Sequence, residues 1–243
     1  MKILVINPNT SDSMTDGIAR AARAVAAPGT NIVAVHPSFG PESIEGHYEE
    51  AWASAGVAEQ ANLAKSWVPS ATVIACFGDP GLEAAREVLS GPVIGIAEAA
   101  FQAASILASG FSVVTTMKRT CIIAERLVQR YGYEHQCRGV HGTDIPVLSL
   151  EDCSKETLEQ IEEASRIALV KDRSGAIVLG CAGMAPLCKV LSERLAVPVI
   201  DGVSVAVKWG EALASLNMNT SKLGDYAVPQ SKRYSGFAEK IAI

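Results

Sequence analysis

The chain contains an internal repeat, which constrains its fold more than any other feature. The segment 71–78, Ala-Thr-Val-Ile-Ala-Cys-Phe-Gly, resembles the segment 175–183, Gly-Ala-Ile-Val-Leu-Gly-Cys-Ala-Gly, so that Cys76 and Cys181 occupy matching positions. Each segment is followed by a short predicted helix and then by Pro-Val-Ile, at 92–94 and at 198–200. This shared order indicates two similar halves, each with one cysteine at the carboxyl end of a strand.

Short apolar runs alternate with longer amphipathic stretches along the whole chain, a pattern typical of parallel strands joined by crossover helices. The predicted fold class is α/β, with two pseudo-symmetric lobes that are each a parallel sheet flanked by helices. Ligands of such sheets bind at the carboxyl ends of the strands, so we expect the site in the cleft between the lobes. The predicted strands are 3–6, 31–35, 72–76, 93–96, 111–115, 176–180 and 199–200, and the predicted helices are 13–26, 48–65, 81–89, 98–108, 120–131, 154–171, 186–195 and 203–216.

The composition narrows the class of protein. The chain has 243 residues, of which 49% are hydrophobic and 19% charged, and its net charge is −5. These values argue against a disordered chain and against a nucleic-acid partner, which would need clustered positive charge. The most apolar stretch, 92–111, is interrupted by Glu98 and Gln102, so we expect a buried strand and helix instead of a membrane span. We therefore expect a cytoplasmic protein, and the apolar composition favours a homo-oligomer.

The six cysteines and four histidines do not show the spacing of a metal site, so we expect no metal, and in a reducing compartment the cysteines should be free thiols. Cys76 and Cys181 are the candidates for chemistry. The other four are interpreted as structural: Cys121 and Cys188 on helices, and Cys137 and Cys153 beside loops.

Both candidate cysteines stand in the same local pattern. Gly78 and Gly183 follow them two residues later, and Asp79-Pro80 and Pro186 suggest helix starts, with Asp79 as the cap of the helix that follows it. A helix N-terminus favours the thiolate, so we expect the pKa of one thiol to lie below the ordinary value of about 8.5. A buried cysteine at the end of a strand is the alternative, and two matched positions make it the weaker interpretation.

Two thiols that face each other across a cleft suit one reaction in particular. One thiolate removes a proton from one face of a carbon and the other thiol delivers a proton to the opposite face, with the roles exchanged for the other enantiomer. The pattern therefore predicts a racemase or epimerase with Cys76 and Cys181 as the acid and base.

Five motifs in order resemble the aspartate/glutamate racemase superfamily, and within it the hydantoin racemases and especially the allantoin racemases. The resemblance implies cofactor-independent racemisation by Cys76 and Cys181, two lobes with the site between them, and a C-terminal segment that returns to the first lobe. On the basis of this resemblance we expect lobe 1 to comprise residues 1–98 and 208–243, and lobe 2 to comprise residues 99–207. The motifs are Ile-Asn-Pro-Asn-Thr at 6–10, Ser-Ile-Glu-Gly at 43–46, Cys-Phe-Gly-Asp-Pro-Gly at 76–81, Gly-Cys-Ala-Gly-Met at 180–184 and Thr-Ser-Lys at 220–222.

The expected substrate is a small cyclic ureide, because the residues beside the cysteines are mainly apolar and suit a neutral ring. The closer resemblance favours allantoin over other 5-substituted hydantoins, although the sequence does not place the walls that contact the 5-substituent. No cofactor is expected, since the carbanion next to a ring carbonyl needs only N–H donors. The expected substrate-binding residues are Asn7, Phe39, Ser43, Gly78, Thr115, Thr116, Ala182 and Gly183.

Other functions remain open at this stage. The same scaffold suits an amino-acid racemase, a decarboxylase, or a maleate isomerase in which one cysteine is a nucleophile. A dicarboxylate substrate would require arginines at the cleft. A two-lobed binding protein without catalysis is the more distant alternative, and it gives no reason for the matched cysteines.

Overall fold

The structure is a computed structural model that describes residues 1–150 and 154–241. Within them, eight β-strands alternate with eight α-helices. The first half comprises β1 (Lys2–Ile6), α1 (Asp12–Val25), β2 (Asn31–Val35), α2 (His47–Ala64), β3 (Ala71–Ile74), α3 (Leu82–Val88), β4 (Val93–Gly95) and α4 (Ile96–Leu107). The second half comprises β5 (Phe111–Thr115), α5 (Cys121–Arg130), β6 (Cys137–Gly142), α6 (Lys155–Lys171), β7 (Ala176–Leu179), α7 (Cys188–Leu195), β8 (Val199–Asp201) and α8 (Gly202–Ser215).

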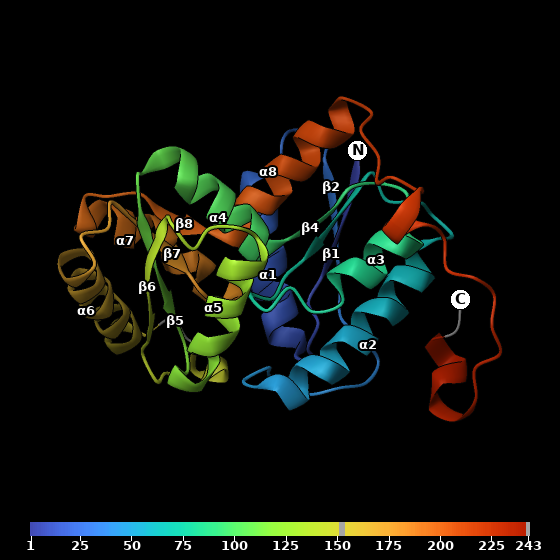
Figure 1. The fold of residues 1–243 in the computed structure, drawn as a ribbon, viewed down its shortest axis with the longest axis horizontal. Coiled ribbons are helices and arrows are strands. Elements are labelled where there is room, and N and C mark those ends of the chain that lie inside the picture. Colours follow the sequence, from blue (N-terminus) through green and yellow to red (C-terminus); the bar gives the residue numbers. More distant parts are fainter. Residues whose placement is uncertain (151–153, 242–243) are drawn as a thin grey trace.

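The strands form two parallel four-stranded sheets with the same internal order, β2-β1-β3-β4 and β6-β5-β7-β8. The repeat recognised around the cysteines therefore extends through four strand–helix units in each half, and the predicted α/β class is confirmed. The two sheets lie on opposite sides of the molecule in Figure 1, each with helices against it.

Burial explains why these segments become strands. Ile3, Val5 and Ile6 of β1 and Val113 and Val114 of β5 have no solvent-exposed surface. Strands of a parallel sheet are covered by helices on both faces, so they consist of consecutive apolar residues instead of an alternating pattern.

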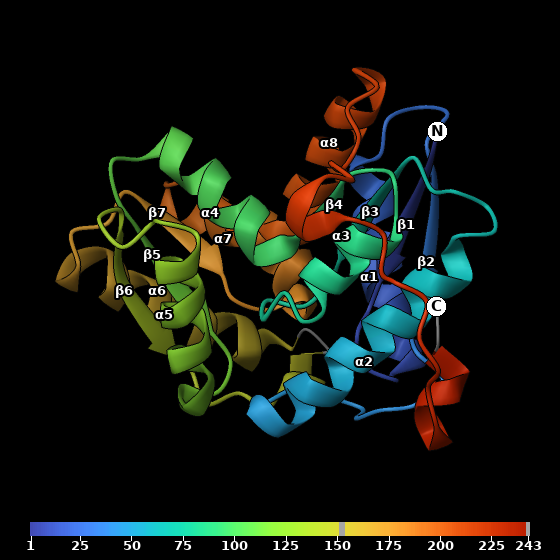
Figure 2. The same ribbon diagram turned by 45° about the vertical axis from the view of Figure 1, so that its right-hand side comes forward.

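The helices α4 and α8 connect the two halves. Each follows the last strand of one sheet, and the two helices pack against each other. The helix α4 also contacts β7 and β8 of the second sheet, whereas α8 crosses to β3, β4 and α1 of the first half (Figure 2). The expected lobe boundaries at 98/99 and 207/208 thus fall inside these two connecting helices.

The C-terminal segment after α8 runs over the first half. The N–H of Thr220 donates to the Ser90 carbonyl at 2.9 Å, and the Lys222 ammonium donates to the Glu87 carbonyl at 3.0 Å near the end of α3. Two short 3₁₀ segments follow, η4 (Gly224–Tyr226) beside α3 and η5 (Gly236–Ile241) against α2 (Figure 1).

The predicted helices and strands agree with the observed ones to within about two residues, with one strand omitted. The omitted strand is β6, whose sequence Cys-Arg-Gly-Val-His-Gly is polar and contains two glycines. It is an edge strand with a register shift against β5, so it needs no apolar face. Cys137, predicted beside a loop, begins this strand, and Cys153 lies outside the described residues.

Candidate active site

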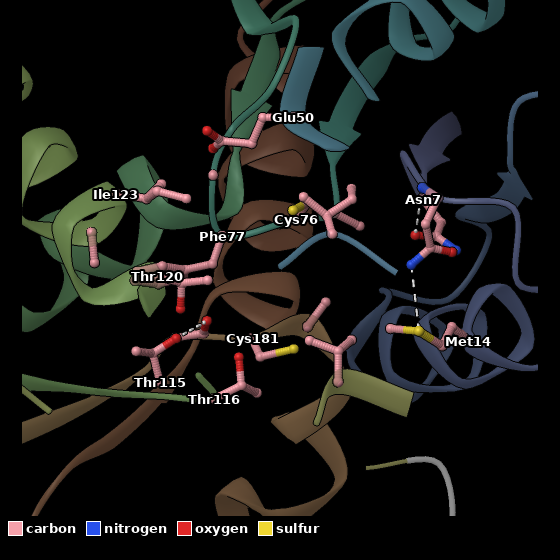
Figure 3. Close-up of a pocket in the computed structure, with 18 residues that line it drawn as sticks. Asn7, Met14, Glu50, Cys76, Phe77, Thr115, Thr116, Thr120, Ile123 and Cys181 are labelled. Atoms are coloured by element: carbon pink, nitrogen blue, oxygen red, sulfur yellow. Dashed lines mark hydrogen bonds between the residues drawn. The ribbon is translucent and has the colours of Figure 1, made fainter. Parts of the chain in front are cut away.

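Cys76 and Cys181 line one cavity of about 60 Å³ between the two halves. Cys76 follows β3 and Cys181 follows β7, so both thiols lie at carboxyl ends of strands. In the first sheet β3 pairs with β1, and in the second sheet β7 pairs with β5. On one side of each pair lies the strand that follows β1 or β5 in the chain, and on the other side lies the strand that follows β3 or β7. This is the switch point at which parallel sheets bind ligands. Figure 3 shows both sulfur atoms turned toward the middle of the pocket.

The Cys76 thiol is held in a bend between β3 and α3. The backbone N–H of Gly78 donates to its sulfur atom, which favours the thiolate, but burial in the cleft dominates and raises the pKa from 9.0 to about 12. The neighbouring charges of Cys181, Glu50 and Asp79 raise it further. Asp79 closes the bend with a positive φ of 45°.

The Cys181 thiol immediately precedes the 3₁₀ segment η3 (Ala182–Leu187) and is its N-cap residue. The N–H groups of Gly183 and Met184 donate to its sulfur atom, but burial again dominates and raises the pKa from 9.0 to about 11. The charge of Glu45 acts in the same direction.

These values correct the expectation that helix N-termini would lower a thiol pKa. Cys76 lies six residues before the start of α3, too far for the helix N-terminus to act on its thiol. Cys181 is followed by the 3₁₀ segment η3, which contains Pro186, and not by an α-helix. The cost of a thiolate in the desolvated cleft exceeds the gain from the N–H donors. Both groups therefore favour the thiol form more strongly than a free cysteine does.

Asp79 caps a different helix from the one predicted. Its carboxylate accepts the N–H of Ala97 at 3.1 Å and that of Glu98 at 3.0 Å, at the start of α4 and not of α3. The prediction was wrong because the bend reverses the chain and turns the side chain toward the connecting helix. The Asp79 carboxylate fits there because residue 95 is glycine. A Cβ atom at this position would lie 2.2 Å from the Asp79 carboxyl carbon and would clash with it. Burial raises the pKa of Asp79 from 3.8 to about 7. Pro80 lies before the first turn of α3.

The predicted polar residues Asn7, Thr115 and Thr116 all line the cavity. Asn7 uses its side-chain NH₂ within the protein, donating to Asn9 Oδ1 at 2.7 Å and to Thr15 Oγ1 at 2.9 Å. Thr115 donates its hydroxyl to the Gly180 carbonyl at 2.9 Å. Thr116 is also buried and stands beside Cys181 in Figure 3.

The remaining predicted residues divide into two groups. Gly78 and Ala182 line the cavity, and Gly183 contributes the N–H that reaches the Cys181 sulfur. Phe39 and Ser43 do not line it. The Phe39 ring instead packs edge-on against Phe237, with ring centroids 4.4 Å apart, in a separate apolar pocket near the C-terminal segment.

The sequence pattern of the Asp/Glu/hydantoin racemase family matches residues 3–209, and the two cavity-lining cysteines fall inside this range. The chain belongs to the Asp/Glu/hydantoin racemase family. It is therefore an isomerase of the racemase type, as its matched cysteines predict.

Individual members of the family support this assignment over the whole chain. A hydantoin racemase of Pseudomonas sp. (strain NS671) is 45% identical over 241 residues, which cover 99% of this chain and 97% of the relative. The structure of an allantoin racemase from Klebsiella pneumoniae superimposes with a TM-score of 0.97 at 54% identity, covering 100% of this chain and 99% of the other. The allantoin racemase of Pseudomonas fluorescens gives a TM-score of 0.93 at 40% identity, covering 97% and 100%.

Several residues of this racemase site have no signal in the sequence. Glu50 of α2, Thr120 and Ile123 near the start of α5, Ile44 in a loop and Val147 in a short 3₁₀ segment also line the cavity. Glu50 lies on a helix whose charged residues are typical of a solvent-exposed face. Only the folding of α2 over the cleft brings this residue to the thiols.

The described part of this racemase has no group of three or more His, Cys, Asp or Glu side chains arranged to hold a metal ion. Among its described helices, none has the length and apolar character needed to cross a membrane.

Proposed function

We propose that this chain is a cofactor-independent racemase of cyclic ureides, with allantoin as the preferred substrate and other 5-substituted hydantoins next. The observation that carries the proposal is that Cys76 and Cys181, from equivalent positions of the two halves, line one cavity. The allantoin preference is supported by the 54% identity to the allantoin racemase of Klebsiella pneumoniae.

The proposed reaction moves one proton off the reacting carbon and another onto it. The Cys76 or Cys181 thiolate takes the proton from one face, and the electron pair passes to the adjacent ring carbonyl as an enolate. The opposite thiol then delivers its proton to the other face and becomes the thiolate. The enzyme thus ends each turnover with the charge on the other sulfur, ready for the opposite enantiomer.

Backbone donors support both sulfur atoms in this reaction. The N–H of Gly78 serves the Cys76 thiolate, and those of Gly183 and Met184 serve the Cys181 thiolate. Because these N–H groups point to sulfur, we assign the enolate oxygen to the Thr116 hydroxyl and the Ala182 N–H, from two residues that line the cavity. Such preorganised donors stabilise developing negative charge more than water does.

The cavity favours a neutral ring over the dicarboxylates of the alternative enzymes. Among the described residues that line it, none is Lys or Arg, and Glu50 adds a negative charge. An aspartate, glutamate or maleate carboxylate would have no basic partner there and would be repelled by Glu50.

Circular dichroism tests the proposal with single enantiomers of allantoin, 5-benzylhydantoin, glutamate and aspartate. The EDTA-dialysed protein should abolish the signal of allantoin fastest, that of 5-benzylhydantoin more slowly, and leave both amino acids unchanged. Faster decay of either amino acid than of both hydantoins would contradict the proposed substrate class.

A further inference from the structure

Glu50 is the charged side chain of the catalytic cavity. Among the described residues that line the cavity, it is the only Asp, Glu, Lys or Arg. Glu50 lies in the first turn of α2, and its side chain is 20% exposed to solvent. The two-thiol reaction itself assigns no task to a carboxylate at this position.

One of the two carboxylate oxygens is occupied within the protein. Glu50 Oε2 lies 3.0 Å from His47 Nδ1, and His47 Nε2 lies 3.4 Å from the Arg126 guanidinium of α5. Arginine only donates and an ionised carboxylate only accepts, so a neutral imidazole with its proton on Nδ1 satisfies both contacts. This chain of contacts from the second half fixes the orientation of the Glu50 carboxylate.

The other oxygen, Oε1, is directed at the bend that carries the first thiol. A Cβ atom on Gly78 would lie 2.5 Å from it, so the oxygen occupies the space that a side chain at this position would fill. The negative charge of Glu50 also acts on the Cys76 thiol, whose pKa it raises. Figure 3 shows the carboxylate above Phe77 at the same wall of the pocket. Glu50 Oε1 and the Cys76 thiol therefore lie near each other at the same wall of the cavity.

We propose that Glu50 is a specificity-determining residue, and that its Oε1 accepts an N–H hydrogen bond from the substituent beside the reacting carbon. The inference rests on the proposed cyclic-ureide racemisation. A ureido substituent offers N–H donors to Oε1, whereas a hydrocarbon substituent offers none and would displace water from this oxygen without replacing its hydrogen bonds. Ile44, Ile123 and Val147 are among the apolar residues of the same cavity.

The test compares kcat/KM for allantoin and for 5-benzylhydantoin in the wild type, Glu50→Leu and Glu50→Gln, each confirmed as folded by its thermal unfolding. Glu50→Leu should lower kcat/KM for allantoin by about 30-fold and leave that for 5-benzylhydantoin unchanged or higher. Glu50→Gln, whose carbonyl still accepts a hydrogen bond, should fall between. Glu134→Leu, an exposed glutamate outside the cavity, is the matched control and should resemble the wild type.

Equal losses for both substrates in Glu50→Leu and Glu50→Gln would overturn the inference, because they would show a general role without selectivity. Unchanged allantoin kinetics in Glu50→Leu would overturn it as well. Both results require an active wild type, so they leave the proposed function intact. A wild type inactive on both hydantoins would instead overturn the proposed function, and this inference with it.

Discussion

The Tyr131 hydroxyl donates a 2.8 Å hydrogen bond to the Asp79 carboxylate, and this contact joins the two halves beside the first thiol. Asp79 lies three residues after Cys76, and Tyr131 is the C-cap residue of α5 in the second half. The same carboxylate accepts two N–H groups at the start of the connecting helix α4. One buried side chain thus fixes the loop of Cys76 both to the second half and to the link between the sheets.

Tyr131→Phe removes this bond while it keeps the ring. We expect the free energy of unfolding to fall by about 2 kcal/mol, because a buried carboxylate loses one of its donors. Urea denaturation measures the effect. Tyr133→Phe is the matched control, since the Tyr133 ring packs on Phe101 and Phe111 and no hydrogen bond of its hydroxyl occurs among the described residues. A similar loss in both variants would contradict the role given to the Asp79 contact.

Asp79 should also make stability depend on pH. Its pKa is raised from 3.8 to about 7 by burial, so the folded protein keeps a proton that the unfolded chain releases. The stabilisation is complete below the unfolded pKa and is lost as the pH rises through about 7. In a comparison of wild type and Asp79→Asn, the wild-type advantage in unfolding free energy should therefore shrink from about pH 5 to about pH 8. An advantage that grows with pH would contradict this assignment.

The high thiol pKa values predict the pH dependence of catalysis. With values of about 12 for Cys76 and about 11 for Cys181, the thiolate fraction is small at neutral pH and increases with pH. After subtraction of the enzyme-free rate, kcat/KM for allantoin should rise by about tenfold per pH unit between about pH 6 and about pH 9. A plateau that begins near neutral pH would show that one thiol is already ionised.

Two glycines of the repeat should respond differently to alanine. At Gly78 the new Cβ meets the flexible end of Glu50, so Gly78→Ala should barely change the unfolding free energy but should displace the carboxylate and weaken allantoin turnover. At Gly180 the Cβ would lie 2.6 Å from Thr115 Cβ and 3.0 Å from its Cα. Gly180→Ala should therefore destabilise the protein by about 2 kcal/mol. Urea denaturation and racemisation assays of both variants check this contrast, which equal destabilisation would refute.

The sequence allowed most of the fold to be predicted, because both halves depend on buried apolar strands whose order is repeated. Runs of consecutive apolar residues identify β1 and β5 in the sequence, and the repeated Cys-x-Gly motif predicts that both thiols lie at strand ends. The edge strand β6 escaped prediction because it is stabilised by pairing with β5 and not by an apolar face.

The chemistry of the site was less predictable, since it depends on contacts between distant segments. Asp79 has the sequence context of a cap for α3 and caps α4 instead, because the bend after Cys76 redirects its side chain. Glu50 lies among charged residues of a helix, and only the packing of α2 over the cleft brings it to Gly78. The thiol pKa values follow from desolvation in the assembled cleft, which no local motif encodes.

Deuterium exchange tests the two-thiol account most directly. Single enantiomers of allantoin are incubated in D₂O with the wild type, Cys76→Ser and Cys181→Ser, while circular dichroism follows inversion and NMR follows loss of the proton at the reacting carbon. The account predicts that each variant loses racemisation by about 1,000-fold or more, yet still exchanges the proton of one enantiomer, and that the two variants act on opposite enantiomers. Racemisation at the wild-type rate in either variant, or no exchange by either variant with either enantiomer, would contradict it.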